Sequence, residues 1–225
     1  MREFLLNSCS TAIWIITFFE LVLIALFFTR YSKTKNAMTL CMGLITIGLF
    51  IDALFISLGT VLPESTLAAI SPVRFISHGI LIPLLFPIGA YGMDAKKGFQ
   101  KAMWILAVVL MIAGAAEGIA TDLTMQSFAG VIRFVSAETT PGWATAIAMG
   151  LSFGTVIPLM IFGIIAWKRK KTPCLFLAGF FMFAFSAIGP ATGNSDLIFY
   201  ISMFGELLMV FFFYIFSKQT TKVNK

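Results

Sequence analysis

Apolar residues run along this chain in long blocks, and polar residues are mostly confined to the short stretches between the blocks. A helix needs about 20 apolar residues to cross the hydrocarbon core of a bilayer, because each residue advances it by about 1.5 Å. The pattern predicts an all-α, polytopic membrane protein with seven transmembrane helices, forming a single domain over residues 1–225. The predicted spans are residues 9–30, 37–62, 67–92, 101–121, 143–167, 173–193 and 196–217.

The charges between the apolar blocks alternate in kind along the chain. Lys and Arg gather after the first, third and fifth blocks and in the C-terminal tail, whereas the other connections are mainly acidic. Because Lys and Arg concentrate in short cytoplasmic loops, we expect the N-terminus outside and the C-terminus in the cytoplasm. The longest connection, residues 122–142, is then an external loop, either a short hairpin or an interfacial segment. The basic residues behind this prediction are Arg30, Lys33, Lys35, Lys96, Lys97, Lys101, Lys168, Arg169, Lys170, Lys171, Lys218, Lys222 and Lys225.

The overall composition supports the same class and argues against several others. The chain is 59% hydrophobic and only 12% charged, whereas a soluble domain carries about 25% charged residues. Its net charge of +6 comes from the loop cations, so it indicates topology rather than binding to nucleic acid. Cys9, Cys41 and Cys174 lack metal-ligand spacing, and the sequence predicts neither a metal site nor a cofactor. We expect the protein to lie in the cell membrane, meaning the plasma or inner membrane.

Six ionisable residues lie within the predicted spans, where each costs roughly 2.5–3.5 kcal/mol to insert and therefore suggests a functional site. Counted from the outer ends of the spans, Glu20, Asp52, His78 and Glu206 lie at nearly one depth, and Arg74 and Glu117 lie closer to the outside. We expect one polar site, open to the outer face, that binds a ligand or an ion. Its four carboxyl groups exceed the basic groups, so either some are protonated or a cation binds there. Polar pairs that merely fix helix packing are the alternative. The six residues are Glu20, Asp52, His78, Glu206, Arg74 and Glu117.

The third predicted span contains Pro72, Pro83 and Pro87. Proline removes a backbone hydrogen-bond donor and leaves carbonyl groups that neighbours or water must satisfy, so we expect a bent or broken helix. Arg74 and His78 lie on this span four residues apart, which puts them on one helical face. Broken helices often flank binding sites in transporters, and the third span is therefore the best candidate for the working helix.

Two pairs of glycines at four-residue spacing occur in the fourth and fifth spans, Gly114 with Gly118 and Gly150 with Gly154. Small residues at this spacing let two helices approach closely. Packing within one chain is the ordinary explanation. The alternative is a homo-oligomer that forms through either pair.

Residues 150–154 also match the G-x-S-x-G pattern of serine hydrolases, with Ser152 in the nucleophile position. In soluble hydrolases this motif needs a strand–turn–helix elbow, which is not predicted here. Ser152 nevertheless lies at the predicted depth of His78 and Asp52. If the protein is an enzyme, the catalytic candidates are therefore His78 as base, Asp52 as the group that orients it, and Ser152 as nucleophile.

These features favour a small membrane transporter or channel, coupled to protons or another cation, that acts on a small molecule or ion. Protonation of a carboxyl group at mid-membrane depth removes its desolvation cost and can drive a conformational switch. An intramembrane enzyme acting on a lipid or lipid-linked substrate, with His78 as base, is one alternative. A seven-helix sensory or receptor-like protein is another. Retinal is not expected, because every lysine lies in a loop, at an inner span edge or in the tail, away from the bundle interior.

Overall fold

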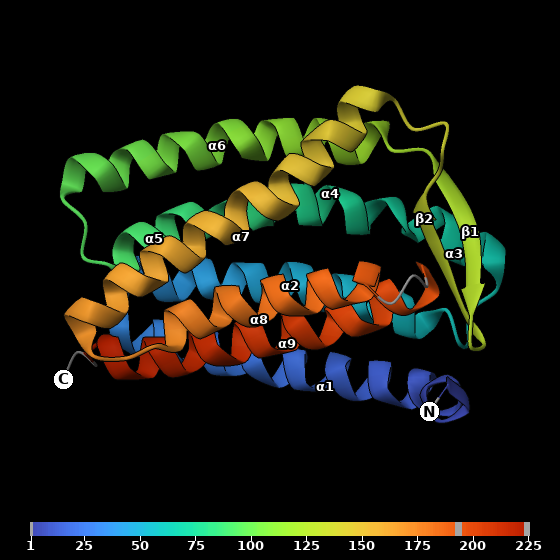
Figure 1. Ribbon diagram of the computed structural model, residues 1–225, viewed down its shortest axis with the longest axis horizontal. Coiled ribbons are helices and arrows are strands. Elements are labelled where there is room, and N and C mark those ends of the chain that lie inside the picture. The colour runs from blue at the N-terminus through green and yellow to red at the C-terminus, as the bar shows by residue number, and fades with distance from the viewer. Residues whose placement is uncertain (1, 192–194, 223–225) are drawn as a thin grey trace.

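The chain folds into long helices that lie side by side, with a small two-stranded hairpin at one end (Figure 1). The computed structural model describes residues 2–191 and 195–222, and describes side chains over residues 8–188 and 199–222. Six helices in these ranges are long and apolar enough to cross a membrane. The protein is thus a membrane-embedded helical bundle, and the hairpin is its only strand structure within the described residues.

Most of the predicted spans correspond to single helices, although the helices run past the predicted ends. The first helix reaches Thr34, and the fifth long helix continues to Lys170. The apolar helix in the predicted span 173–193 is short, Cys174–Ile188 within the described side chains, and residues 192–193 lie outside the described residues. The elements are α1 (Arg2–Thr34), α2 (Ala37–Leu58), α3 (Glu64–Ile70), α4 (Pro72–Leu81), the 3₁₀ turn η1 (Ile82–Leu84), α5 (Leu85–Gly92), α6 (Lys97–Ala120), β1 (Leu123–Phe128), β2 (Val131–Ser136), α7 (Gly142–Lys170), α8 (Cys174–Ala191) and α9 (Ser195–Thr220).

The proline-rich third span is broken into four pieces: α3, α4, η1 and α5. Pro72 occupies the first turn of α4, where its missing N–H is not needed. Pro83 lies inside η1, and the tighter winding there separates α4 from α5. The expected interruption of this span is therefore present, and it falls on both sides of the helix that carries Arg74 and His78.

The connection between α6 and α7 contains an antiparallel hairpin in which Phe128 faces Val131 across the turn. Ala129 and Gly130 form the turn with positive φ angles of 51° and 77°, the combination that suits the twist of a two-residue hairpin. Phe128 and Val131 are almost fully buried and belong to a cluster that includes Ile13 of α1. The hairpin therefore packs its apolar tip into the end of the bundle.

Helices α4 and α6 touch through their backbones. A Cβ atom added at Gly79 would lie 2.3 Å from the carbonyl oxygen of Gly114, and one added at Gly118 would lie 2.6 Å from the backbone nitrogen of Ile76. Gly114 and Gly118 thus pack within the chain. A Cβ atom added at Gly150 or at Gly154 would meet nothing within 4 Å, so the space beside α7 at these two positions is open.

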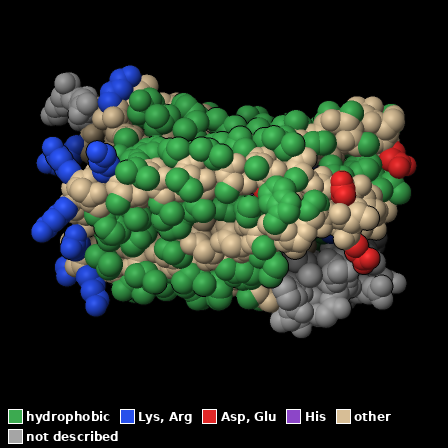
Figure 2. All heavy atoms as spheres, turned by 90° about the horizontal axis from the view of Figure 1, so that it is seen from above, with side chains coloured by type: hydrophobic (Ala, Val, Ile, Leu, Met, Phe, Trp, Pro, Cys, Tyr) green, Lys and Arg blue, Asp and Glu red, His purple; other side chains and the backbone are tan. Residues whose placement is uncertain are grey.

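The surface is divided in a way that suits a bilayer. Figure 2 shows Lys and Arg side chains gathered at one end of the molecule, acidic side chains at the other, and hydrophobic side chains between them. Large apolar side chains are exposed along this middle zone, for example Ile112 and Ile119 of α6, which are 68% and 73% exposed. A soluble monomer rarely exposes such a wide apolar surface. The apolar surface of this chain instead suits contact with the hydrocarbon of a bilayer.

Candidate functional site

An ion pair between α2 and α4 lies at the centre of the polar region. Nε of Arg74 donates a hydrogen bond of 2.8 Å to Oδ1 of Asp52. The side chains are only 9% and 18% exposed, respectively. The pair forms because the break at Pro72 starts a new helix whose first turn presents Arg74 to α2. Each charge compensates for the desolvation of the other.

The same arginine ties the bundle to the hairpin. Nη1 of Arg74 donates a hydrogen bond of 3.1 Å to the backbone carbonyl of Phe134 in β2. Two residues before Phe134, the amide of Ile132 donates a hydrogen bond of 3.1 Å to the carbonyl of Gly59 at the end of α2. Strand β2 is therefore fastened to the two helices that carry the ion pair.

A cavity of about 220 Å³ lies beside the ion pair and is the polar part of the site. His78 lines it one turn after Arg74, and Glu117 lines it from α6. Glu117 is 6% exposed, and its Oε1 accepts a hydrogen bond of 3.1 Å from the Thr121 hydroxyl. Among the described residues it has no ion-pair partner. Four of the six predicted residues, namely Asp52, Arg74, His78 and Glu117, thus meet at one cavity.

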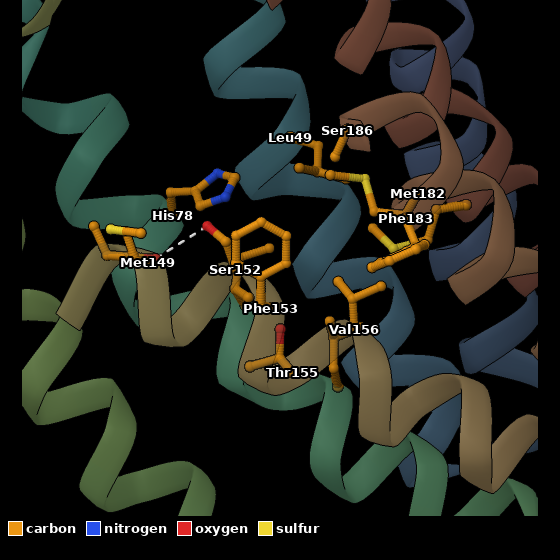
Figure 3. Close-up of a pocket in the computed structure, with 14 residues that line it drawn as sticks. Leu49, His78, Met149, Ser152, Phe153, Thr155, Val156, Met182, Phe183 and Ser186 are labelled. Atoms are coloured by element: carbon orange, nitrogen blue, oxygen red, sulfur yellow. Dashed lines mark hydrogen bonds between the residues drawn. The ribbon is translucent and has the colours of Figure 1, made fainter. Parts of the chain in front are cut away.

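A second cavity of about 310 Å³ adjoins the first and is mostly apolar. The two cavities share His78, Ile82, Ala148 and Ser152 in their linings. Figure 3 shows Ser152 of α7 beside the His78 ring, with apolar side chains around them.

The Ser152 hydroxyl donates to the carbonyl of Ala148 at 3.0 Å. Ser152 lies within the continuous helix α7, so the strand–turn–helix elbow of a soluble hydrolase is not present at this motif.

The remaining two predicted residues, Glu20 of α1 and Glu206 of α9, lie in the bundle interior and do not line either cavity. Glu20 is fully buried and Glu206 is 7% exposed. Both carboxyl oxygens of Glu20, and Oε2 of Glu206, have no hydrogen-bond partner within the described residues. These two carboxyl groups therefore add buried acidic groups from α1 and α9 to the bundle interior.

Arg133 lies in β2 next to Phe134, whose carbonyl Arg74 binds, although its position between two spans gave no reason to expect it there. Its guanidinium lies 3.7 Å from the centre of the Phe199 ring, and its Nη2 donates to Oε1 of Gln126 at 2.5 Å. Strand β2 carries it to the end of the bundle, so only the hairpin fold identifies it. The β-branched and aromatic residues over 131–135 were the sequence signal for this strand.

The site holds none of the usual metal or cofactor ligand sets. Within the described residues no group of three or more His, Cys, Asp or Glu side chains could hold a metal ion. No lysine of the described chain lines either of the two cavities. Cys9, Cys41 and Cys174 are buried and free.

No protein family model matches this chain, and no curated protein matches it. Its chemistry is therefore inferred from the arrangement of its own side chains.

Proposed function

We propose that this protein is a small membrane transporter in which proton binding at buried carboxyl groups is coupled to movement of a small molecule or cation. Asp52, Arg74, His78 and Glu117 would form the binding site. Glu20 and Glu206 would bind the coupling proton or cation. Each residue would act at the depth where an ionisable group is costly and is kept for a function.

The observation that carries this proposal is the partnerless state of Glu20. A fully buried carboxylate without a hydrogen bond is strongly disfavoured, whereas the neutral carboxyl is tolerated. Neither oxygen of Glu20 has a partner among the described residues. A purely structural role would give this carboxyl a donor to bind. Its environment instead favours a group that gains and loses a proton as the protein changes conformation.

The ion pair offers a simple route for coupling. Arg74 neutralises Asp52 in the described conformation. A proton or cation that arrives at Glu206 or Glu20 reduces the negative charge around Arg74 and thereby changes the balance of its interactions. Because Arg74 also donates a hydrogen bond to the Phe134 carbonyl, this change would reach the hairpin.

The transport proposal includes a topology of seven spans with the N-terminus outside and the C-terminus in the cytoplasm of a cell membrane. The separation of basic and acidic side chains at opposite ends of the bundle supports this orientation (Figure 2). Helix α8 supplies the seventh span, together with the six longer apolar helices. In this orientation the hairpin faces the outside.

The test uses purified protein in liposomes that contain the pH-sensitive dye pyranine. Gradients of Na⁺ or K⁺, with and without a membrane potential, are imposed across the bilayer. We expect proton movement that depends on the protein and is abolished by Glu206→Gln and by Asp52→Asn, while both variants still insert and fold. Glu138→Gln makes the same chemical change at an exposed position and should have no effect. Normal proton movement in both site variants would overturn the proposal.

A second candidate is an intramembrane enzyme that acts on a lipid or lipid-linked substrate. One observation favours it: His78 and Ser152 line the same apolar cavity, and Met149 and Phe153 in its wall are 59% and 49% exposed. The cavity thus opens on the side of the bundle, where a lipid would enter. His78 would act as base toward an attacking hydroxyl group.

A fluorophosphonate probe, which reacts with activated serines, tests the enzyme proposal directly. Labelling that is lost in both Ser152→Ala and His78→Ala would support it. Absence of labelling in the unmodified protein would remove Ser152 as a nucleophile.

A further inference from the structure

We propose that the ligand of this site is a lipophilic cation, meaning a molecule with one positive charge and a sizeable apolar body, which enters from the bilayer. This inference rests on the proposed transport function and names its substrate class. It follows from the way in which the two adjoining cavities differ in chemistry.

The two cavities adjoin each other, and the charged side chains lie mostly in the lining of one of them. The polar cavity of about 220 Å³ is lined by Asp52, Arg74 and Glu117, and the apolar one of about 310 Å³ contains no charged side chain other than His78. Both share the wall formed by His78 and Ala148. A ligand that fills this space must therefore be charged or polar at one end and apolar at the other.

The charges at the polar end select the sign of the ligand. Arg74 already pairs with Asp52, so its charge is compensated before a ligand arrives. Glu117 is buried, lines the cavity and has no cationic partner within the described residues. An anion placed there would meet two carboxyl groups and one occupied arginine, whereas a cation would complete the pairing of Glu117.

The walls suit a soft, bulky cation rather than a small hydrated ion. Phe75 lines the polar cavity, and Phe153 and Phe183 line the apolar one. Aromatic faces attract cations whose charge is poorly hydrated. Met149 and Met182 add flexible, polarisable surface that can adapt to different ligand shapes. A small ion such as Na⁺ would leave most of this apolar space unfilled.

The route of entry also favours an apolar body. Ser152 and Phe153 are exposed on α7, in the half that precedes Pro158. Figure 3 shows their side chains at the edge of the cavity near His78. A lipophilic cation partitions into the bilayer and reaches this opening from the side, with its charge drawn toward Glu117.

Equilibrium binding of tritiated tetraphenylphosphonium to the full chain in phosphatidylcholine nanodiscs tests the inference, with empty nanodiscs as background. We expect saturable binding that weakens by roughly tenfold or more in Glu117→Gln, because a charge pair at low dielectric is lost. Ala148→Phe, which fills the junction of the two cavities, should abolish binding. Glu138→Gln, on the exposed connection, is the matched control and should bind normally.

Competition on the unmodified protein keeps the test independent of variant folding. We expect dodecyltrimethylammonium to displace tetraphenylphosphonium and dodecyl phosphate not to displace it. Saturable binding of dodecyl phosphate that is lost in Arg74→Gln, together with no saturable binding of the cation, would overturn the inference. Cation binding that survives both Glu117→Gln and Ala148→Phe would also overturn it, because the cation would then bind elsewhere.

This assay needs no ion gradient, so its outcome is separate from that of the proton-movement experiment. Binding without proton movement would refute the coupling and retain the ligand class. Proton movement without binding of the cation would refute the ligand class and retain the coupling.

Discussion

Nε of Arg74 lies 2.8 Å from Oδ1 of Asp52, and this contact joins the broken third span to α2 inside the membrane zone. His78, one turn further along α4, lines the same cavity as Asp52. Arg74 also donates a hydrogen bond to the Phe134 carbonyl of the hairpin. Asp52 is thus linked through Arg74 to α4 and to the hairpin, and these contacts determine what a substitution there should do.

Removing the charge of Arg74 from this pair should destabilise the protein strongly. Arg74→Gln leaves Asp52 without its main countercharge, and the loss is about 3–5 kcal/mol for a buried pair that is broken on one side. Thermal unfolding in mild detergent measures the effect. The double variant Asp52→Leu with Arg74→Met should recover much of the stability and none of the transport.

The pair of Lys170 with Asp94 is the matched control, since the side chain of Asp94 is 66% exposed. Asp94→Asn should change the stability by less than about 1 kcal/mol. Equal effects of Arg74→Gln and Asp94→Asn would contradict a structural role for the buried pair.

The glycines divide into two groups that should respond in opposite ways. Gly79→Val and Gly114→Val force side-chain atoms into a backbone contact at which a Cβ atom would already lie 2.3 Å from an oxygen. Overpacking of this kind costs about 1–3 kcal/mol or more. Gly150→Ala and Gly154→Ala meet open space and should stabilise α7 by up to about 1 kcal/mol each, from helix propensity. A fall in unfolding temperature for the second pair would place a neighbouring chain against this face.

The hairpin should detach when its attachment to α2 is crowded. A Cβ atom at Gly59 would lie 1.8 Å from the carbonyl oxygen of Ile132, so Gly59→Ala should push β2 away. The amide of Ile132, which donates to Gly59, would then exchange its hydrogen faster. Hydrogen exchange read by mass spectrometry over 123–136 measures this change. Gly98→Ala, where a Cβ atom meets nothing within 4 Å, should leave the exchange unchanged.

Replacing Glu20 with an apolar residue should make the protein more stable and less active. Glu20→Leu removes a buried carboxyl that lacks a partner in the described residues and should raise the unfolding free energy by about 1–3 kcal/mol. Proton movement in liposomes should be lost in the same variant. Destabilisation by Glu20→Leu would instead indicate that the carboxyl supports the structure.

The orientation of the chain can be tested with a membrane-impermeant thiol reagent on intact cells. The native cysteines are buried, so they should contribute little background labelling. Glu138→Cys should be labelled from outside, whereas Lys168→Cys should be labelled only after the membrane is permeabilised. The reverse result would invert the proposed topology.

The sequence predicted the helical membrane class because long apolar blocks and loop charges are local features that depend on composition alone. It also predicted the interruption at Pro72 and Pro83, since proline acts on its own helix. The seven-span topology and its orientation remain predictions. The form of the external connection was open between a hairpin and an interfacial segment, because β1 and β2 depend on packing against the bundle.

The candidate site was predicted less completely, because depth along a helix follows from counting and rotation about its axis does not. Counting placed Asp52, His78 and Glu20 at one level, but only the packing shows that Asp52 and His78 line a cavity while Glu20 does not. The contribution of the Phe134 carbonyl has no side-chain signature at all. Arg133 was hidden for a similar reason, since its role depends on where the hairpin folds back.

The backbone contact between Gly79 and Gly114 has a mechanical consequence. With no side chains between them, the backbones of α4 and α6 are in close contact, so we expect the two helices to move together and to carry Arg74 and Glu117 with them. Helix α7 has Pro158 within it and open space at Gly150 and Gly154. We therefore expect any movement that opens or closes the cavities to occur in the part of α7 before Pro158, with Pro158 as the hinge.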